Sequence, residues 1–292
     1  RLIAVLSPAL GREGLEHLKR RVLALSKEPL PKARKKVQLI AGWDLGNRDY
    51  REEVLESSRA STVRLALQAI ADAQGDVDAF IAQYDEKTRK VPRIAADIVQ
   101  RLLAVGRVED AWSTIEATEH GRRDWPDFEW EDARIDVLEA LGRSDEAQAA
   151  RWSCFQRSLS APHLRAYLKQ LPDFDDLEAE EQALDHARKY TSLLQALSFF
   201  VSWPDLDRAA SLVIERAGEL DGNHYEFLTP AAHALAGKHP LAATLVLRAM
   251  VDFSLTQGRS SRYRHAARHF MECASLASTI QDFGNFETHE TY

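Results

Sequence analysis

Apolar residues recur along this chain at the spacing of an amphipathic helix, interrupted by short breaks. Val99, Leu102 and Leu103 follow this spacing, and so do Leu212 and Val213 further along. No segment alternates apolar and polar residues in the manner of a half-buried strand. The pattern therefore predicts an all-helical protein.

A recurring motif marks the breaks between the helices. Gly106 follows an apolar run and precedes Ala111, and 36 positions later Gly142 precedes Ala147 in the same way. Glycine tolerates the left-handed conformation that ends a helix, and proline fits the first turn of the next helix. With the weaker copies included, breaks fall near residues 75, 106, 142, 172, 204 and 237.

These breaks lie 30 to 36 residues apart, which leaves room for two helices and two short turns. Stacked pairs of this size bury one another's apolar faces, so the repeat predicts a right-handed α-solenoid of antiparallel helix pairs. We expect a basic helical segment at residues 1–47, helix-pair repeats at 48–281 and a tail at 282–292. Because the chain begins with Arg1 and not with Met, we expect it to be part of a longer protein.

The turn within each helix pair resembles that of tetratricopeptide repeats. The shared spacing, a glycine and then an alanine five positions later, occurs at Gly106…Ala111, Gly142…Ala147 and Gly237…Ala242. Where that family places a large aromatic residue after the alanine, this chain has Ile115, Arg151 and Val246. The resemblance implies tetratricopeptide-like helix pairs, without membership in that family.

Longer segments resemble a bacterial family known only as a domain of unknown function. The resemblance covers nearly the whole chain and is clearest in Ser61–Lys90, Trp125–Ala140, Leu159–Phe174 and Arg262–Leu276. The C-terminal part is also similar to helical regions of some SWIM-type zinc-finger proteins, although the zinc-finger motif itself does not occur in this sequence. The resemblance implies a bacterial, cytoplasmic protein with no assigned activity.

Composition and cysteine usage narrow the class of protein. Of the 292 residues, 45% are hydrophobic and 28% are charged, which is typical of a folded protein. No apolar run reaches the ~18 residues of a membrane span. The sequence has only two cysteines, Cys154 and Cys273, which excludes a disulfide scaffold and fits a reducing compartment such as the cytoplasm.

The net charge of −7 hides an asymmetry along the chain. Residues 1–36 carry ten Lys or Arg against three Glu, whereas Glu109–Glu146 carries 13 Asp or Glu against four Arg. A nucleic-acid backbone would meet mostly like charge, so we do not expect general nucleic-acid binding. The basic N-terminal helix is either a local nucleic-acid patch or, as we favour, a solvated face opposite the apolar positions Leu15, Leu18, Val22 and Leu25.

A candidate metal site occurs near the C-terminus, where His265, His269 and Cys273 share one face of a predicted helix. Imidazole and thiolate are natural Zn²⁺ ligands. Eight residues of helix span about 12 Å, however, so at most one neighbouring pair can share an ion. We therefore favour the alternative in which Cys273 packs as a small apolar residue, and we predict no cofactor.

The same predicted helix is rich in arginine. Together with Tyr263, the side chains of Arg262, Arg264 and Arg268 could bind an acidic peptide or a phosphate. The alternative is that they offset the acidic repeats that precede them.

A second candidate for partner binding is the aromatic and acidic turn that holds Trp125, Phe128 and Trp130. Exposed aromatic residues are frequent hot spots of protein interfaces, yet they also fill the space between packed helices. We favour packing, with Asp127 as the N-cap of the helix that follows.

Known catalytic motifs do not occur in the sequence: there is no Gly-x-Ser-x-Gly elbow, Walker loop or His-Glu-x-x-His. The preferred hypothesis is a non-enzymatic helical-repeat scaffold for a protein or peptide, with the acidic middle repeats favouring a basic partner. One alternative is a metal-dependent or enzymatic module that uses the C-terminal His/Cys helix. Another is a nucleic-acid adaptor that works through the basic N-terminal helix.

Overall fold

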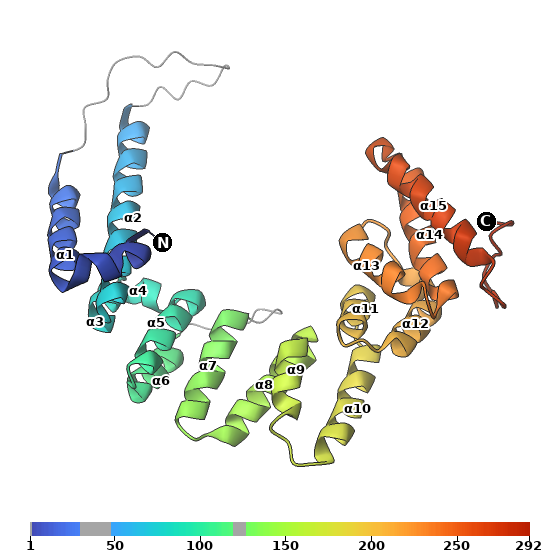
Figure 1. Cartoon of the computed structure of the whole chain (residues 1–292), viewed down its shortest axis with the longest axis horizontal. Coiled ribbons are helices and arrows are strands. Elements are labelled where there is room, and N and C mark those ends of the chain that lie inside the picture. The colour runs from blue at the N-terminus through green and yellow to red at the C-terminus, as the bar shows by residue number, and fades with distance from the viewer. Residues whose placement is uncertain (1, 30–47, 119–126) are drawn as a thin grey trace. The chain divides into compact units, whose positions relative to one another are not determined.

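A computed structural model describes residues 2–29, 48–118 and 127–292 of the chain (Figure 1). Every regular element within these ranges is a helix, and no strand occurs in them. The prediction of an all-helical chain is therefore confirmed. Backbone contacts divide the chain into two compact units, and in sequence the first ends at Arg143 and the second continues from Ser144.

The first unit contains helices α1 to α7. Their bounds are α1 Leu2–Lys27, α2 Arg48–Gln74, α3 Val77–Ile81, α4 Glu86–Arg89, α5 Pro92–Ala104, α6 Val108–Glu116 and α7 Phe128–Ala140. Helix α1 packs against α2, and α5 packs against α3, α6 and α7. The core of this unit therefore centres on α5, and it includes Phe80, Ile98, Leu102, Ile115 and Val137.

Helix α1 bends at Gly11 and buries only part of the face that the sequence pattern marks as apolar. Leu15 is buried and Leu18 and Val22 are half-buried, whereas Leu25 is exposed. The prediction of a continuous buried face is thus wrong at its C-terminal end.

Gly106 and Gly142 stand at the ends of α5 and α7 with φ values of +77° and +72°. In both turns the backbone N–H of the arginine that follows donates to the carbonyl five residues earlier, at 2.9 Å. This is the Schellman arrangement, in which the left-handed residue lets the chain close the helix and turn away. A side chain at either position would strain the backbone.

The second unit contains helices α8 to α15 and two short 3-10 helices. Their bounds are α8 Ser144–Ser158, α9 Ala161–Leu168, α10 Asp175–Arg188, α11 Leu193–Ser202, α12 Leu206–Glu215, η1 Ala217–Glu219, α13 Tyr225–Leu235, α14 Pro240–Thr256, η2 Ser260–Arg262 and α15 Tyr263–Ala277. Helix α11 packs against α12 and α13, and α14 packs against α12, α13 and α15. The core of this unit includes Phe155, Leu197, Phe200, Leu212, Leu228, Met250 and Cys273.

Arginine side chains join segments that lie about one repeat apart in sequence. In the first unit, Nε of Arg101 donates to a carboxylate oxygen of Asp72, 29 positions earlier, at 2.6 Å. In the second unit, Nη2 of Arg208 reaches Glu181, 27 positions earlier, at 2.6 Å. These bonds connect α2 with α5 in the first unit and α10 with α12 in the second.

Candidate functional site

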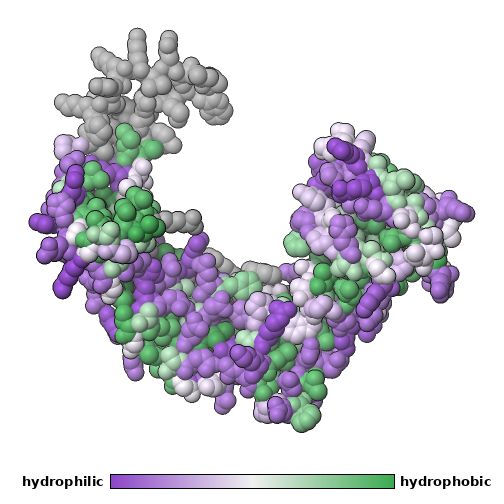
Figure 2. Space-filling view, in the orientation of Figure 1, coloured by the Kyte–Doolittle hydropathy of each residue, from purple (hydrophilic) through white to green (hydrophobic). Residues whose placement is uncertain are grey.

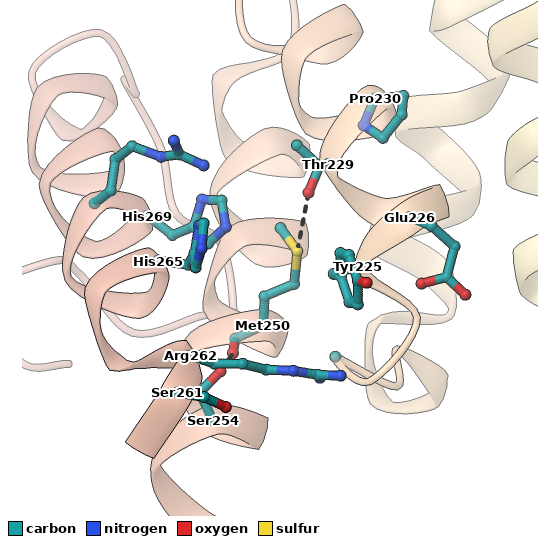
Figure 3. A pocket seen from close by; sticks show the side chains of 12 residues that line it. Tyr225, Glu226, Thr229, Pro230, Met250, Ser254, Ser261, Arg262, His265 and His269 are labelled. Atoms are coloured by element: carbon teal, nitrogen blue, oxygen red, sulfur yellow. Dashed lines mark hydrogen bonds between the residues drawn. The ribbon is translucent and has the colours of Figure 1, made fainter. Parts of the chain in front are cut away.

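A cavity of about 520 Å³ lies among the last helices of the second unit (Figure 3). We call it the α13–α15 pocket, because α13, α14, α15 and the turns that flank them supply its walls. It is lined by Gly222, Tyr225, Glu226, Thr229, Pro230, Met250, Ser254, Ser261, Arg262, His265, Arg268 and His269. Its volume lies within the range of about 300–1,000 Å³ that is usual for small-ligand sites.

The turn that precedes α13 is fixed directly on the backbone of α14. A Cβ added at Gly222 would stand 2.0 Å from the carbonyl oxygen of Ala249, so only glycine fits at this position. The close approach places the start of α13, with Tyr225 and Glu226, at the edge of the pocket. Pro230 has no N–H, so the Glu226 carbonyl, four residues earlier, lacks its helical hydrogen bond.

The floor of the pocket is apolar, and its hydroxyl groups are already bonded. Met250 of α14 is buried, and the Thr229 hydroxyl donates to its sulfur at 3.6 Å. The Ser254 hydroxyl donates to the Met250 carbonyl at 2.7 Å. In Figure 3, Met250 lies between the α13 and α15 side chains that face the cavity. The floor therefore suits an aliphatic or aromatic group better than a polar one.

Arg262 crosses one end of the pocket and has no acidic partner within the described chain (Figure 3). Its Nη1 donates to the neutral side-chain oxygen of Asn223 at 3.2 Å. Its guanidinium lies over the rings of Tyr225 and Phe253, at 4.9 and 5.6 Å from their centroids. These contacts hold the side chain in place but leave its positive charge uncompensated.

The other basic side chains of the pocket come from α15. His269 is only 5% exposed, and its Nδ1 lies 3.3 Å from Glu272. Arg268 is exposed and shares the same carboxylate, with its Nε 3.7 Å from Glu272. His265 is exposed, and no hydrogen bond or ion pair of its side chain is found in the described part of the chain.

The start of α15 is strongly electropositive. No side chain caps this helix end, and its first turn holds no acidic residue. Residues 259–268 include four arginines and neither Asp nor Glu. Figure 2 shows hydrophilic surface over this end of the helix, beside hydrophobic surface. The helix dipole adds to the arginine charge, so this surface favours an anionic group.

The three candidate metal ligands do not converge. Cys273 is fully buried in the core, with its Sγ 3.9 Å from the Thr244 carbonyl, while His265 faces the pocket. Burial raises the pKa of the Cys273 thiol to about 11, so it stays protonated at neutral pH, whereas the thiolate is the metal-binding form. Within the described residues, no group of three or more His, Cys, Asp or Glu side chains could hold a metal ion.

Comparison with known proteins gives a family but no activity. The model of a family of unknown function, DUF6880, matches residues 1–292. The chain belongs to this family. No curated protein and no solved structure matches the chain. The predicted membership in a family of unknown function is therefore confirmed, whereas the resemblances to SWIM-type and tetratricopeptide proteins are not.

Of the aromatic candidates in this DUF6880 member, Phe128 and Trp130 belong to the first unit, whereas the pocket belongs to the second. Trp130 is 6% exposed and belongs to the core, and Phe128 is half-buried. Asp127 caps α7, because its Oδ1 accepts a hydrogen bond from the Trp130 backbone N–H at 3.3 Å. Trp125 lies outside the described residues.

Among the helices described, none is long and apolar enough to cross a membrane.

The sequence prediction found the basic wall of the pocket and missed the rest. Arg262 and Arg268 line the pocket, whereas Tyr263 and Arg264 are exposed on the same helix without lining it. The opposite wall and the floor were not predicted, because they come from α13 and α14. Two sequence features bear on these walls only indirectly: Pro230 lies inside α13, and Gly222 lies just before that helix.

Proposed function

We propose that this DUF6880 member is a non-enzymatic interaction module of stacked helix pairs, and that its α13–α15 pocket binds an acidic segment of a partner protein. The observation that carries the proposal is Arg262, a cation that stacks on two aromatic rings at the edge of an apolar cavity and has no carboxylate partner. A partner's carboxylate would supply the missing charge.

The order in which the helices pack supports the stacked architecture. In each unit, helices contact both the next helix and the next but one, as α5 does with α6 and α7 and α11 does with α12 and α13. Hydrogen bonds between positions 27 and 29 apart connect one pair to the next. Tetratricopeptide-like solenoids are built in this way, and we propose that this chain is one of them.

The charge of the pocket favours an acidic partner over the basic partner that the acidic middle repeats suggest. Many carboxylates outside the pocket are used inside the molecule: Asp110 pairs with Arg107 at 2.6 Å, and Glu129 with Arg93 at 3.2 Å. A basic partner would compete with these internal arginines. The arginines of residues 259–268, in contrast, have no carboxylate partner in any preceding helix within the described chain.

The apolar floor sets the second requirement for the partner. Met250, Tyr225 and Pro230 offer carbon surface in the same pocket as Arg262. A segment that alternates acidic and aliphatic residues would place a carboxylate on the guanidinium and an aliphatic side chain against Met250. Such a segment gains from apolar burial as well as from charge.

The test is a fluorescence-anisotropy titration with a labelled peptide of alternating Glu and Leu. A peptide with Lys in place of each Glu serves as the ligand control. We expect the acidic peptide to bind, and Arg262→Gln to weaken it about tenfold or more, since a hydrogen bond to a charged group contributes about 1.5–3 kcal/mol. Arg264→Gln, two positions further along in α15 but outside the pocket, is the matched control and should bind normally. Equal affinity for the lysine peptide, or full affinity in Arg262→Gln, would disprove the proposed site.

A further inference from the structure

A buried arginine lies in a second cavity, on another side of α14. This cavity measures about 440 Å³ and is bounded by α14, by the turn around η1 and by the C-terminal segment, residues 278–292. Arg248 of α14 lines it and is only 6% exposed. Leu220, Phe253 and Phe286 give the cavity apolar walls.

The guanidinium of Arg248 uses only part of its bonding capacity. Nη1 donates to the Glu287 carbonyl at 2.8 Å. Nε and Nη2 are buried and find no hydrogen-bond partner in the described chain. These two nitrogens form one edge of the planar group, the edge that binds a carboxylate through two parallel hydrogen bonds. A buried donor without a partner costs free energy, so an edge left open in this way indicates a missing ligand.

The C-terminal segment covers the guanidinium without satisfying it. The ring of Tyr292 lies over the plane of Arg248, with its centroid 4.3 Å from Cζ. The Tyr292 hydroxyl donates to Asp252, and Phe286 packs on the core of the unit. The contact with Arg248 is therefore made by the face of the ring, and the Nε–Nη2 edge stays unpaired beneath it.

We propose that this cavity binds a single carboxylate carried by a small aliphatic group, with the two carboxylate oxygens on Nε and Nη2 of Arg248. The aliphatic part would lie against Leu220 and Phe253. The charge of the rim selects against a doubly charged phosphate, because Asp221 and Asp252 also line the cavity. The ligand enters when Tyr292 lifts away from the guanidinium.

Two sources could supply this chemistry, a free amino acid or the C-terminus of a peptide. In the free amino acid, the ammonium group would approach Asp252 or Asp221. In a peptide C-terminus that ammonium is replaced by an amide. L-leucine and N-acetyl-L-leucine represent the two sources, and L-leucinamide, which lacks the carboxylate, is the control ligand.

The experiment is isothermal titration calorimetry of the full chain with these three compounds. We expect L-leucine or N-acetyl-L-leucine to bind at least tenfold more tightly than L-leucinamide; tighter binding of N-acetyl-L-leucine assigns the site to a peptide C-terminus. Arg248→Lys keeps the charge but loses the two-nitrogen edge, and it should lose at least tenfold in affinity, with folding checked by circular dichroism. Because the comparison of ligands uses the unaltered chain, it holds even if the variant does not fold. Binding of L-leucinamide equal to that of L-leucine, or no binding of any of the three, would overturn the proposal.

Discussion

Arginines in two regions of this molecule have opposite surroundings. Where helices that are not consecutive meet within one unit, Arg101 bonds to Asp72 and Arg208 to Glu181, 29 and 27 positions earlier in sequence. In residues 259–268, Arg262 meets only an amide oxygen and two aromatic rings. The first arginines connect helices of one unit, whereas Arg262 has no carboxylate partner in the described chain. Residue type alone does not distinguish the two roles. They differ in whether a carboxylate 27 to 29 positions earlier in sequence bonds to the arginine.

Hydrogen bonds to carboxylates also change the pKa of the paired arginines. The hydrogen bond to Asp72 raises the pKa of Arg101, and the bond to Asp205 raises that of Arg208. These cations are therefore stabilised by carboxylates within their own units. We expect their replacement to affect stability, and replacement of Arg262 to affect binding.

The largest expected effect concerns the packing that builds the pocket. Gly222→Ala should lower the free energy of unfolding by about 1–3 kcal/mol, because the new Cβ would overlap the α14 backbone. Gly218→Ala is the matched control, since a Cβ there meets nothing within 4 Å, and it should change stability by less than about 0.5 kcal/mol. Chemical denaturation measures both variants. Equal stability of the two would show that the turn does not depend on this contact.

A smaller effect is expected at the paired arginines. Arg101→Gln should cost about 0.5–1 kcal/mol, because the pair with Asp72 is partly exposed and the guanidinium also stacks 3.7 Å from the centroid of Phe80. A double-mutant cycle with Asp72→Asn isolates the pair itself. Arg264→Gln should leave stability unchanged. A coupling free energy of zero between Arg101 and Asp72 would show that the pair does not stabilise the fold, and the contrast with Arg262 would no longer hold.

A separate prediction is a pH dependence that does not involve arginine, which keeps its charge throughout. Burial raises the pKa of Cys273 from 9.0 to about 11, so folding favours the protonated thiol. Its contribution is fully present below pH 9 and is lost as the pH rises through about 11. Unfolding free energies measured across this range should therefore fall, and they should fall less steeply in Cys273→Ala. An identical slope in the variant would assign the decline to other groups, such as the half-buried Tyr292, whose pKa is also raised.

Local features of the sequence could be predicted, and contacts between distant segments could not. Helical spacing and the glycine turns at Gly106 and Gly142 depend on neighbouring residues, so they are visible in the sequence. The basic start of α15 likewise follows from the arginines of residues 259–268. Gly222 is required by a backbone contact with α14, 27 positions away, and its neighbouring residues give no sign of it.

The burial of Arg248 is another feature that could not be predicted from the sequence. It interrupts the apolar run of α14, where a charged residue would be assigned to a solvated face. The structure buries it because residues 278–292 fold back over α14, a contact that no periodicity indicates. The division between Arg143 and Ser144 likewise falls within an ordinary turn, without a composition shift to mark it.

The most direct test of the central claim compares Arg101→Gln with Arg262→Gln, each measured for its free energy of unfolding and for its affinity for the acidic Glu-Leu peptide. We expect Arg101→Gln to lose stability and keep its affinity, and Arg262→Gln to keep its stability and lose about tenfold or more in affinity. If Arg262→Gln instead lost stability and bound the peptide as well as the unaltered chain does, the arginines of the last helix would be structural, and the proposed binding site would be wrong.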